Sequence, residues 1–598
     1  MSAQQSAAGR FDVAILGGGL AGLSLAIQLK RRRPETTVAV VEKRTWPVPE
    51  AAHKVGESTL QIGAHYFREV CGMGANLERE QLRKMGLRFF LAGAGGEDLR
   101  GRIEMGLAGW VDDAPTYQLD RGRFENALAA EAERLGVEVR AGLSVAGVER
   151  VDGAHVVAVR SAEESAEIRA TWVVDASGRA AILKRKHGLG VEVPHHCNAA
   201  WFRIGRRIEI DDWSEDPAWR RRVPSASRWQ STNHFMGPGY WFWVIPLASD
   251  STSFGLVADP DLVPFERMRR FEPLMEWLHE HEPVAAAELE RHRDALQDFR
   301  LLKHYSHGCE RVFSKDRWCI TGEAGVFLDP LYSPGSDMIA ISNTMITRFV
   351  TGSLEGKDVD LGVEFFNDLY LLISSRLIST WSGQYPIFAR PEVTAAKVTW
   401  DFMTYFGALA LLAVTGNVAE AKFLVTVLRD IDRIAELNLN MQRYLRDWSE
   451  LADGEASCGF PCISDAAYRR LEADVATVRD PERVRQVVAE NAARIEATAI
   501  EIIARSATSL GVDVDPERLD PYSFRLPGGA DPDESGWRPP APTIRGLQEV
   551  SEPFAPLRDP RFGSELRWAT SADPEATVSD AYSVWLPALS GAVSLDER

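Results

Sequence analysis

The chain has 598 residues, enough for about four average domains. Hydrophobic residues make up 45% and charged residues 26%, which excludes a mainly disordered, collagen-like or coiled-coil chain. The 68 basic and 86 acidic residues give a formal charge of −18, which disfavours nucleic acid or an anionic membrane as a partner, because phosphate groups require local positive charge.

Six cysteines are too few for a disulfide-stapled secreted domain, so we expect a reduced, cytoplasmic protein. The apolar stretch near the N-terminus leads directly into glycines, without a basic segment or a cleavage site, and predicts no signal peptide. The longest later apolar run, Phe406 to Val414, is about half the length needed to cross a bilayer. It predicts a buried helix rather than a transmembrane segment, with contact to a membrane surface as the weaker alternative.

The first predicted unit is a strand, a glycine turn, a helix and a second strand. Phe11 to Leu16 is β-rich, Gly17 to Gly22 has the GxGxxG pattern, and Thr37 to Val41 ends in Glu42, twenty residues after the last glycine. Such a unit binds a dinucleotide, with the pyrophosphate on the helix N-terminus and an acidic side chain at the ribose. We expect the binding residues to be Gly17, Gly19, Leu20, Ala21, Gly22, Glu42 and Lys43.

Further along, regular βα repeats stop. Gly136 to Val151 and His155 to Val159 predict a small antiparallel piece, and Thr171 to Asp175 predicts another strand. Alternating, aromatic-rich segments between about 190 and 310 predict a second sheet that could wall a substrate pocket. The chain returns to strand, turn and helix character at Trp318.

The remainder of the chain is predicted to be mostly helical. Helical spacing is visible in Val418 to Trp448 and in Ala466 to Leu510, whereas Asp520 to Pro542 is rich in proline and glycine and predicts loop or extended cover.

Six motifs together point to a known family. They are Gly17 to Gly22, VGEST at Val55 to Thr59, the segment around Arg121, DASGR at Asp175 to Arg179, WFWVIP at Trp241 to Pro246, and Gly322 to Gly335. Their order resembles that of the FAD-dependent monooxygenase superfamily, and VGEST and WFWVIP most closely resemble the flavin-dependent halogenases, often named after tryptophan halogenase. The resemblance covers about residues 10 to 350.

The resemblance implies an α/β fold with a Rossmann-type FAD-binding domain, an inserted antiparallel-sheet substrate domain and a helical C-terminal extension. We predict FAD-binding parts at 10–180 and 311–355, the substrate sheet at 181–310, and a helical region at 356–598 that covers the pocket. It also implies further FAD contacts at Gly56, Ser58, Arg121, Gly322 and Glu323. In the family an aspartate stands where this chain has Glu323.

In such halogenases reduced FAD, oxygen and a halide form hypohalous acid, which travels through a tunnel to a lysine. Lys84, in a K-x-G-x-x-F setting, lies in the family's lysine window. Burial among Met85, Phe89 and Phe90 would disfavour its charged form and make it a nucleophile. The family lysine either forms a haloamine or hydrogen-bonds the acid. The alternatives are a solvated surface lysine at this position, or Lys54 as the halogenation lysine.

The halide site would follow Asp329 in DPLYSPGS. Pro334 has no N–H, so Gly335 and Ser336 would supply the amides. Tryptophan halogenases carry a glutamate where this chain has Tyr332, which favours the phenolic or pyrrolic branch.

Trp241 and Trp243 are predicted to lie at the substrate pocket, although two tryptophans at alternate positions also suit a sheet core. No metal site is expected. Cys458 and Cys462 lack further ligands nearby. His195, His196 and Cys197 form a separate run of adjacent residues, whose side chains would alternate between opposite faces of a strand and so would not share a metal ion.

The resulting hypothesis is a two-component halogenase that acts on a phenol-like or pyrrole-like substrate in natural-product biosynthesis. Its substrate would be a small molecule, free or tethered to a carrier protein, and a separate flavin reductase would supply reduced FAD. An FAD monooxygenase that hydroxylates or epoxidises its substrate is the main alternative, and a flavoprotein with structural FAD and a C-terminal binding module is a third. The sequence does not identify the substrate.

Overall fold

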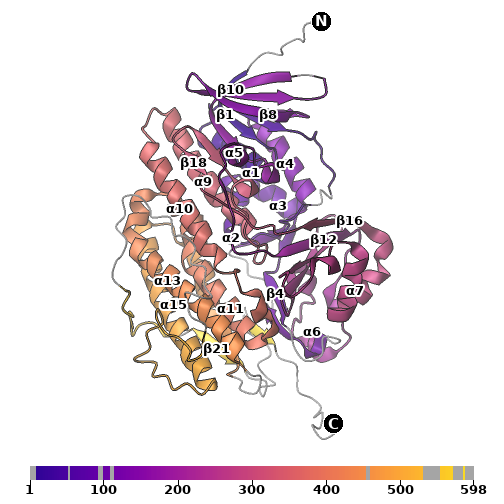
Figure 1. The fold of residues 1–598 in the computed structure, drawn as a ribbon, viewed down its shortest axis with the longest axis vertical. Helices are drawn as coiled ribbons and strands as arrows, with labels where there is room; N and C mark the ends of the chain where they lie inside the picture. Colours follow the sequence, from indigo (N-terminus) through magenta and orange to yellow (C-terminus); the bar gives the residue numbers. More distant parts are fainter. Residues whose placement is uncertain are drawn as a thin grey trace.

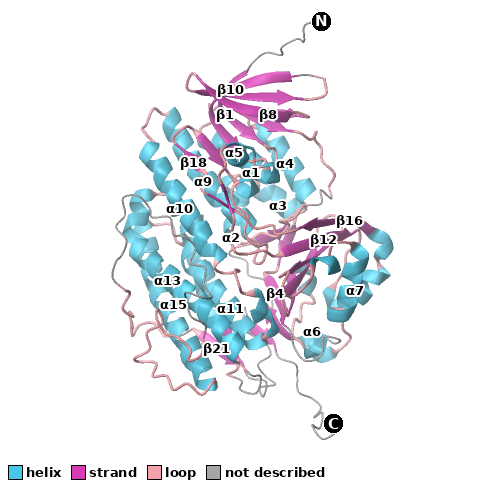
Figure 2. Ribbon diagram, in the orientation of Figure 1, coloured by secondary structure: helices cyan, strands magenta, loops and turns pink. Residues whose placement is uncertain are grey.

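The computed structural model describes residues 9–50, 54–91, 99–107, 114–163, 165–452, 458–529, 553–563, 565–569 and 583–585. Figure 1 and Figure 2 show two β-sheets, one above the other, and a bundle of long helices that lies against both. The expected α/β class with a helical C-terminal region is therefore confirmed, whereas the residue bounds of its parts stay a prediction.

The first sheet is the nucleotide-binding layer, with strand order β18-β19-β10-β1-β2-β7. Neighbours from β19 to β7 pair in parallel, which is the doubly wound arrangement. The strands of this path are β1 (Gly9–Leu16), β2 (Val38–Glu42), β7 (Glu138–Ala141), β10 (Ser165–Asp175), β18 (Phe313–Ser314) and β19 (Trp318–Ile320).

The predicted antiparallel piece is partly correct. Strands β8 (Ser144–Val151) and β9 (Ala154–Arg160) pair antiparallel and continue onto β10. Glu138–Ala141, which we expected in the same piece, instead pairs in parallel with β2 and extends the first sheet. The correction follows from the helix before it, because α4 (Arg121–Arg134) makes the crossover that a parallel strand requires.

The second sheet has strand order β16-β12-β15-β14-β13-β4-β5-β22 and is antiparallel except between β4 and β13. On β14, Trp241 and Trp243 join one apolar core and Phe242 and Val244 join the other, as expected for a strand buried on both faces. Its strands are β4 (Leu87–Leu91), β5 (Ile103–Gly106), β12 (Asn198–Ile204), β13 (Thr232–Gly237), β14 (Tyr240–Pro246), β15 (Thr252–Ala258), β16 (Leu296–Leu302) and β22 (Ser583–Trp585).

Helices α7 (Phe271–His281) and α8 (Pro283–Arg291) cover the outer face of this sheet and pack on its phenylalanines. The inner face belongs to a larger core that continues through the first sheet into the helical region. The described helical region is therefore packed as part of the same body. Shorter helices and strands of the described fold are α2 (Gln61–His65), α3 (Gly74–Glu80), β3 (Leu82–Lys84), β6 (Thr116–Gln118), α5 (Ile182–Lys186), β11 (Gly190–Val191), α6 (Pro217–Arg221), β17 (Gly308–Cys309), β20 (Phe460–Ile463) and β21 (Leu566–Ala569).

The helical region follows α9 (Pro334–Leu354), which runs from the first sheet toward it (Figure 1). Its elements are α10 (Asp360–Ile378), α11 (Pro391–Thr404), the π-helical segment η10 (Tyr405–Ala410), α12 (Leu411–Val414), α13 (Ala421–Leu451), α14 (Asp465–Thr477) and α15 (Pro481–Ser509). The apolar run 406–414 forms η10 and α12 and is mostly buried, as predicted. Among the described residues, no helix is both long and apolar enough to span a membrane.

The predicted cover at 520–542 falls partly outside the described residues, since the structure describes only 520–529 of it. That part consists of turns and irregular chain.

Candidate functional site

The carboxyl edge of the first sheet gathers the predicted nucleotide residues. The backbone N–H of Gly17 donates to Val41 across a distance of 2.8 Å, and Gly17 adopts a positive φ of 114°. A Cβ on Gly22 would lie 2.0 Å from the Gly17 carbonyl oxygen, so this position requires glycine. Together these contacts fix a tight turn at the start of α1 (Leu20–Arg32).

The N-terminus of α1 is built to receive an anion. Its N-cap is Gly19, no side chain caps it, and no acidic residue stands in its first turn. A Cβ on Gly19 would meet no atom within 4 Å, so open space lies in front of the helix. The free N–H groups of Leu20, Ala21 and Gly22 and the positive end of the helix dipole therefore face a space that a pyrophosphate fits.

Glu42 lies beside this turn, at the end of β2. Its carboxylate accepts hydrogen bonds from the Gly18 N–H at 2.8 Å and from the backbone and guanidinium of Arg44. Two oxygens can accept more bonds than these, which leaves room for a ribose hydroxyl. Lys43 follows on the exposed side of the chain.

Arg121 connects the nucleotide edge with the VGEST segment. Its guanidinium donates to the Val55 carbonyl at 2.7 Å and to the buried Glu125 carboxylate at 2.7 Å. Lys54 also pairs with Glu125. Gly56 has a φ of 89°, and a Cβ at this position would lie only 3.0 Å from the Arg121 guanidinium.

Gly322 and Glu323 reach the same edge from β19. Gly322 has a φ of 62°, and a Cβ there would lie 3.0 Å from the Ala21 side chain at the start of α1. Burial raises the pKa of Glu323, while the charges of Arg179 and Arg121 oppose that rise. The open glycine cradle, the uncapped helix end and these charged groups fit FAD, as the sequence predicts.

The predicted halide residues begin α9. Tyr332 and Ser333 both adopt left-handed backbone conformations, with φ of 70° and 61°, and turn the chain into the helix at Pro334. Proline suits the first helical position, because that N–H has no partner within a helix. Gly335 and Ser336 follow, no side chain caps the helix, and the Ser336 hydroxyl is buried without a partner among the described residues. The amides of Gly335 and Ser336 are thus available to an anion.

Lys84 ends β3 and is buried, with 4% exposed. Its amine donates to the Ser58 hydroxyl at 2.9 Å and to the Thr59 carbonyl at 2.8 Å. Burial lowers the pKa of Lys84 to about 7, against a weaker opposing effect of the Asp337 carboxylate. By contrast, burial lowers the pKa of the carboxylate-paired Lys54 only to about 8.

Asp337 is a site residue that the sequence analysis missed. Its carboxylate accepts from the Gly63 N–H and from the Tyr405 hydroxyl, each at 2.8 Å. Burial raises the pKa of Asp337 to about 7, while Lys84 acts in the opposite direction. Asp337 and Lys84 therefore act on each other electrostatically, each favouring the charged form of the other.

His234 is a second polar neighbour of Lys84. Its ring stacks on Phe89 with centroids 4.7 Å apart, and its Nδ1 lies 3.0 Å from the Arg88 carbonyl oxygen. Burial, helped by the charge of Lys84, lowers the pKa of His234 to about 3, so the ring is neutral. Its Nε2 is buried and has no partner in the described chain.

Trp241 and Trp243 lie on the inner face of the second sheet, with ring centroids 5.5 Å apart. The Trp241 indole N–H donates to the Tyr385 hydroxyl at 2.8 Å, and that of Trp243 donates to Ser253 at 3.2 Å. Neither tryptophan lines the cavity described below. Their assignment to a substrate pocket stays a prediction.

Asp329, just before the halide turn, is held by three buried side chains. Its Oδ2 accepts from the hydroxyls of Tyr305 and Tyr385, each at 2.7 Å, and lies 2.5 Å from the His195 Nε2. His195, Cys197 and Asp329 therefore form a cluster of residue types that can bind metal ions. The expectation of opposite faces applies to adjacent residues, whereas His195 and Cys197 are two positions apart, just before β12, and point to the same side. Within the described residues, these hydrogen bonds already engage Oδ2 of Asp329.

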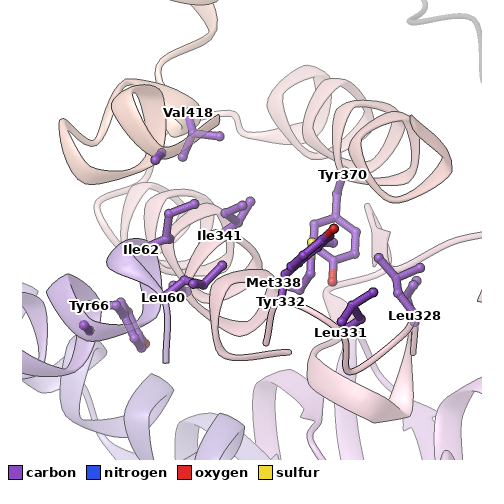
Figure 3. Close-up of a cluster of buried hydrophobic side chains, with 14 of the residues drawn as sticks. Leu60, Ile62, Tyr66, Leu328, Leu331, Tyr332, Met338, Ile341, Tyr370 and Val418 are labelled. Atoms are coloured by element: carbon purple, nitrogen blue, oxygen red, sulfur yellow. The ribbon is translucent and has the colours of Figure 1, made fainter. Parts of the chain in front are cut away.

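A cavity of about 220 Å³ lies between α10, α11, η10 and α13, next to the first turn of α9. Leu60, Tyr332, Pro334 and Asp337 form its inner wall. Figure 3 shows Leu60 and Ile62 beside Ile341 of α9, and Leu60 and Met338 both line the cavity, so the VGEST end and the halide helix meet at this wall. Lys84 lies close to the cavity, because its amine binds the carbonyl of Thr59 and the next residue, Leu60, lines the cavity.

The fold and this edge define an FAD-binding protein. Residues 10–252 match the model of the FAD binding domain family. Flavin-dependent halogenase chlA of Dictyostelium discoideum is 25% identical over 435 residues, covering 67% of this chain and 70% of that protein. The 1H-pyrrole-2-carbonyl-[peptidyl-carrier protein] chlorinase of Pseudomonas fluorescens is 27% identical over 376 residues, covering 58% and 77%.

Among solved structures, that of halogenase PltM has a TM-score of 0.57 at 16% identity, covering 83% of this chain and 96% of that one, and supports the fold. Residues 10–252 thus form an FAD binding domain, and over about two thirds of its length the chain is similar to flavin-dependent halogenases.

Proposed function

We propose that the protein is an FAD-dependent halogenase that uses reduced FAD, oxygen and a halide to halogenate an electron-rich aromatic substrate, with Lys84 as its halogenation lysine. The observation that carries this proposal is the buried Lys84 amine, which among the described residues donates to a hydroxyl and a carbonyl, close to the halide helix and to the cavity.

Bound FAD would supply oxygen activation at the carboxyl edge of the first sheet. The N–H groups of Gly335 and Ser336 would hold the halide. The neutral Lys84 amine would attack the halogen of hypohalous acid, forming an N–halogen bond and releasing water. Transfer of that halogen to an aromatic carbon leaves the nitrogen one proton short and the ring with one proton to lose. Asp337 would accept the ring proton and pass it to the nitrogen, which restores the amine. Hydrogen bonding of the acid by Lys84 is the alternative that the sequence analysis left open.

The proposed substrate is phenol-like or pyrrole-like, either free or tethered to a carrier protein. Two relatives that act on a pyrrole attached to a peptidyl carrier protein support this part of the proposal. A role in natural-product biosynthesis agrees with those relatives. A separate flavin reductase would deliver reduced FAD. We further propose a cytoplasmic location, which agrees with the low number of cysteines, six in 598 residues.

The test is a reaction with photochemically reduced FAD, oxygen and bromide, which removes the need for a reductase. Mass spectrometry of monochlorodimedone and of a panel of phenols and pyrroles should show bromide-dependent bromination. The Lys84→Ala variant should lose bromination but still bind FAD, whereas the Lys54→Ala variant should retain bromination. If the product instead contained oxygen from ¹⁸O₂, in an amount that does not depend on bromide, the protein would be a hydroxylase and the proposal would be contradicted.

A further inference from the structure

The cavity beside the candidate site is long as well as apolar. On α10 its wall runs from Phe365 to Thr380, and on α13 it runs from Leu424 to Asn438. At 1.5 Å per helical residue each wall extends for about 20 Å. A volume of about 220 Å³ spread over such a length describes a narrow channel rather than a round pocket.

The walls of this channel carry mostly aliphatic and aromatic side chains, with Arg376 on α10 and Asp432 and Asn438 on α13 as the main polar exceptions. On α10 they include Leu369, Leu372 and Ile373, and on α13 they include Val425, Leu428 and Ile431. Several of these residues are partly exposed, and Val425 is 54% exposed, so the channel reaches the surface between the two helices. Apolar side chains that are partly exposed to water at the channel mouth favour an apolar ligand, because the ligand would remove them from water.

Polar groups are concentrated on the inner wall. Asp337 accepts from Tyr405 there, and the Tyr332 hydroxyl donates to Asp401 at 3.0 Å. Asp401 also accepts from the buried amine of Lys397 at 2.9 Å. The oxygens of these two carboxyl groups can accept further hydrogen bonds, so a ligand hydroxyl group would find partners at this end.

We propose that the substrate is a free, uncharged molecule with an electron-rich hydroxylated ring and a long apolar chain, the ring lying at Asp337 and the chain in the channel between α10 and α13. This rests on the proposed function. A carrier-bound substrate would instead bring a pantetheine arm, whose two amides would lose their hydrogen bonds to water against the leucine and isoleucine walls.

The experiment measures bromination of 4-methylphenol, 4-butylphenol and 4-octylphenol by the FAD-loaded protein, and their binding by calorimetry. Burial of each methylene should raise kcat/KM and the association constant about threefold to fourfold. Leu372→Trp, which fills the channel, should remove the gain between the butyl and octyl compounds. Leu361→Trp on the same helix, where the residue is 85% exposed, should keep it. Val425→Trp, at the mouth, gives a second channel variant should Leu372→Trp fail to bind FAD.

The outcomes separate the two proposals. Bromination of all three phenols without a chain-length gain would overturn the channel and leave the halogenase standing. A chain-length gain in binding without any bromination would support the channel and contradict the halogenase. Turnover of a carrier-bound phenol with none of its free alkyl counterparts would also overturn the inference.

Discussion

The sharpest prediction concerns the protonation of Lys84. An ordinary lysine with a pKa of 10.5 is neutral at pH 7 in about one molecule in 3,000, whereas burial lowers the pKa of Lys84 to about 7 and leaves about half of it neutral. Burial therefore supplies a gain of about a thousandfold in the nucleophilic form of the amine. The rate of halogenation should follow that neutral fraction, which rises from about one tenth at pH 6 to about nine tenths at pH 8.

We expect the bromination rate to rise about tenfold between pH 6 and pH 8 and to level off above that. The assay is a single turnover with pre-reduced FAD, so that neither a reductase nor flavin supply contributes to the pH profile. Lys84→Arg keeps a hydrogen-bond donor but stays charged, because a guanidinium has a pKa above 12. It should lose at least about 100-fold in rate.

Lys54→Arg is the matched control and should brominate, since the arginine can keep the ion pair with Glu125. A profile that rises only above pH 9, or a Lys84→Arg protein that brominates normally, would refute the nucleophilic amine. The second result would support the form in which the lysine hydrogen-bonds the acid.

Three further predictions follow. Gly19→Ala, whose Cβ enters the open cradle, should weaken FAD binding at least about tenfold without changing the melting temperature of the apoprotein, whereas Gly22→Ala, 2.0 Å from a carbonyl oxygen, should destabilise the fold; equal melting temperatures would contradict this. Asp337→Asn removes the charge that raises the pKa of Lys84, so the midpoint of the rate profile should move to lower pH; a shift to higher pH would argue against the pair. Asp329→Ala leaves three buried donors unpaired, at about 1 kcal/mol or more each, and should lower the melting temperature by several degrees in differential scanning fluorimetry; an unchanged value would show that the network is not stabilising.

Features that depend on a few neighbouring residues were predictable from the sequence. The glycine turn before α1 and the acid at the end of β2 are local patterns, and the structure places Gly17, Gly22 and Glu42 together at one edge. Lys84 was found through its motif setting, and its burial agrees with the apolar residues that surround it in sequence.

Features that depend on distant contacts were not predictable. Asp337 looks like an ordinary first-turn acid of a helix, and its environment comes from Gly63, 274 residues earlier, and Tyr405, 68 residues later. The channel has no motif at all, because leucine and isoleucine at helical spacing on α10 and α13 read as core. Strand β7 was assigned to the wrong partner because a short strand carries no signal for the direction of its neighbour.

The path of the chain between the two sheets has a mechanical consequence. β2 in the first sheet is followed by β4 and β5 in the second, β7 to β10 return to the first, β12 to β16 lie in the second, and β18 and β19 return again. Repeated crossings leave no single linker about which the two layers could swing apart. We therefore expect the two sheets to move in solution as one rigid unit. Small molecules should then enter and leave through motions of side chains and small shifts of helices, and not by a hinge motion that opens the space between the sheets.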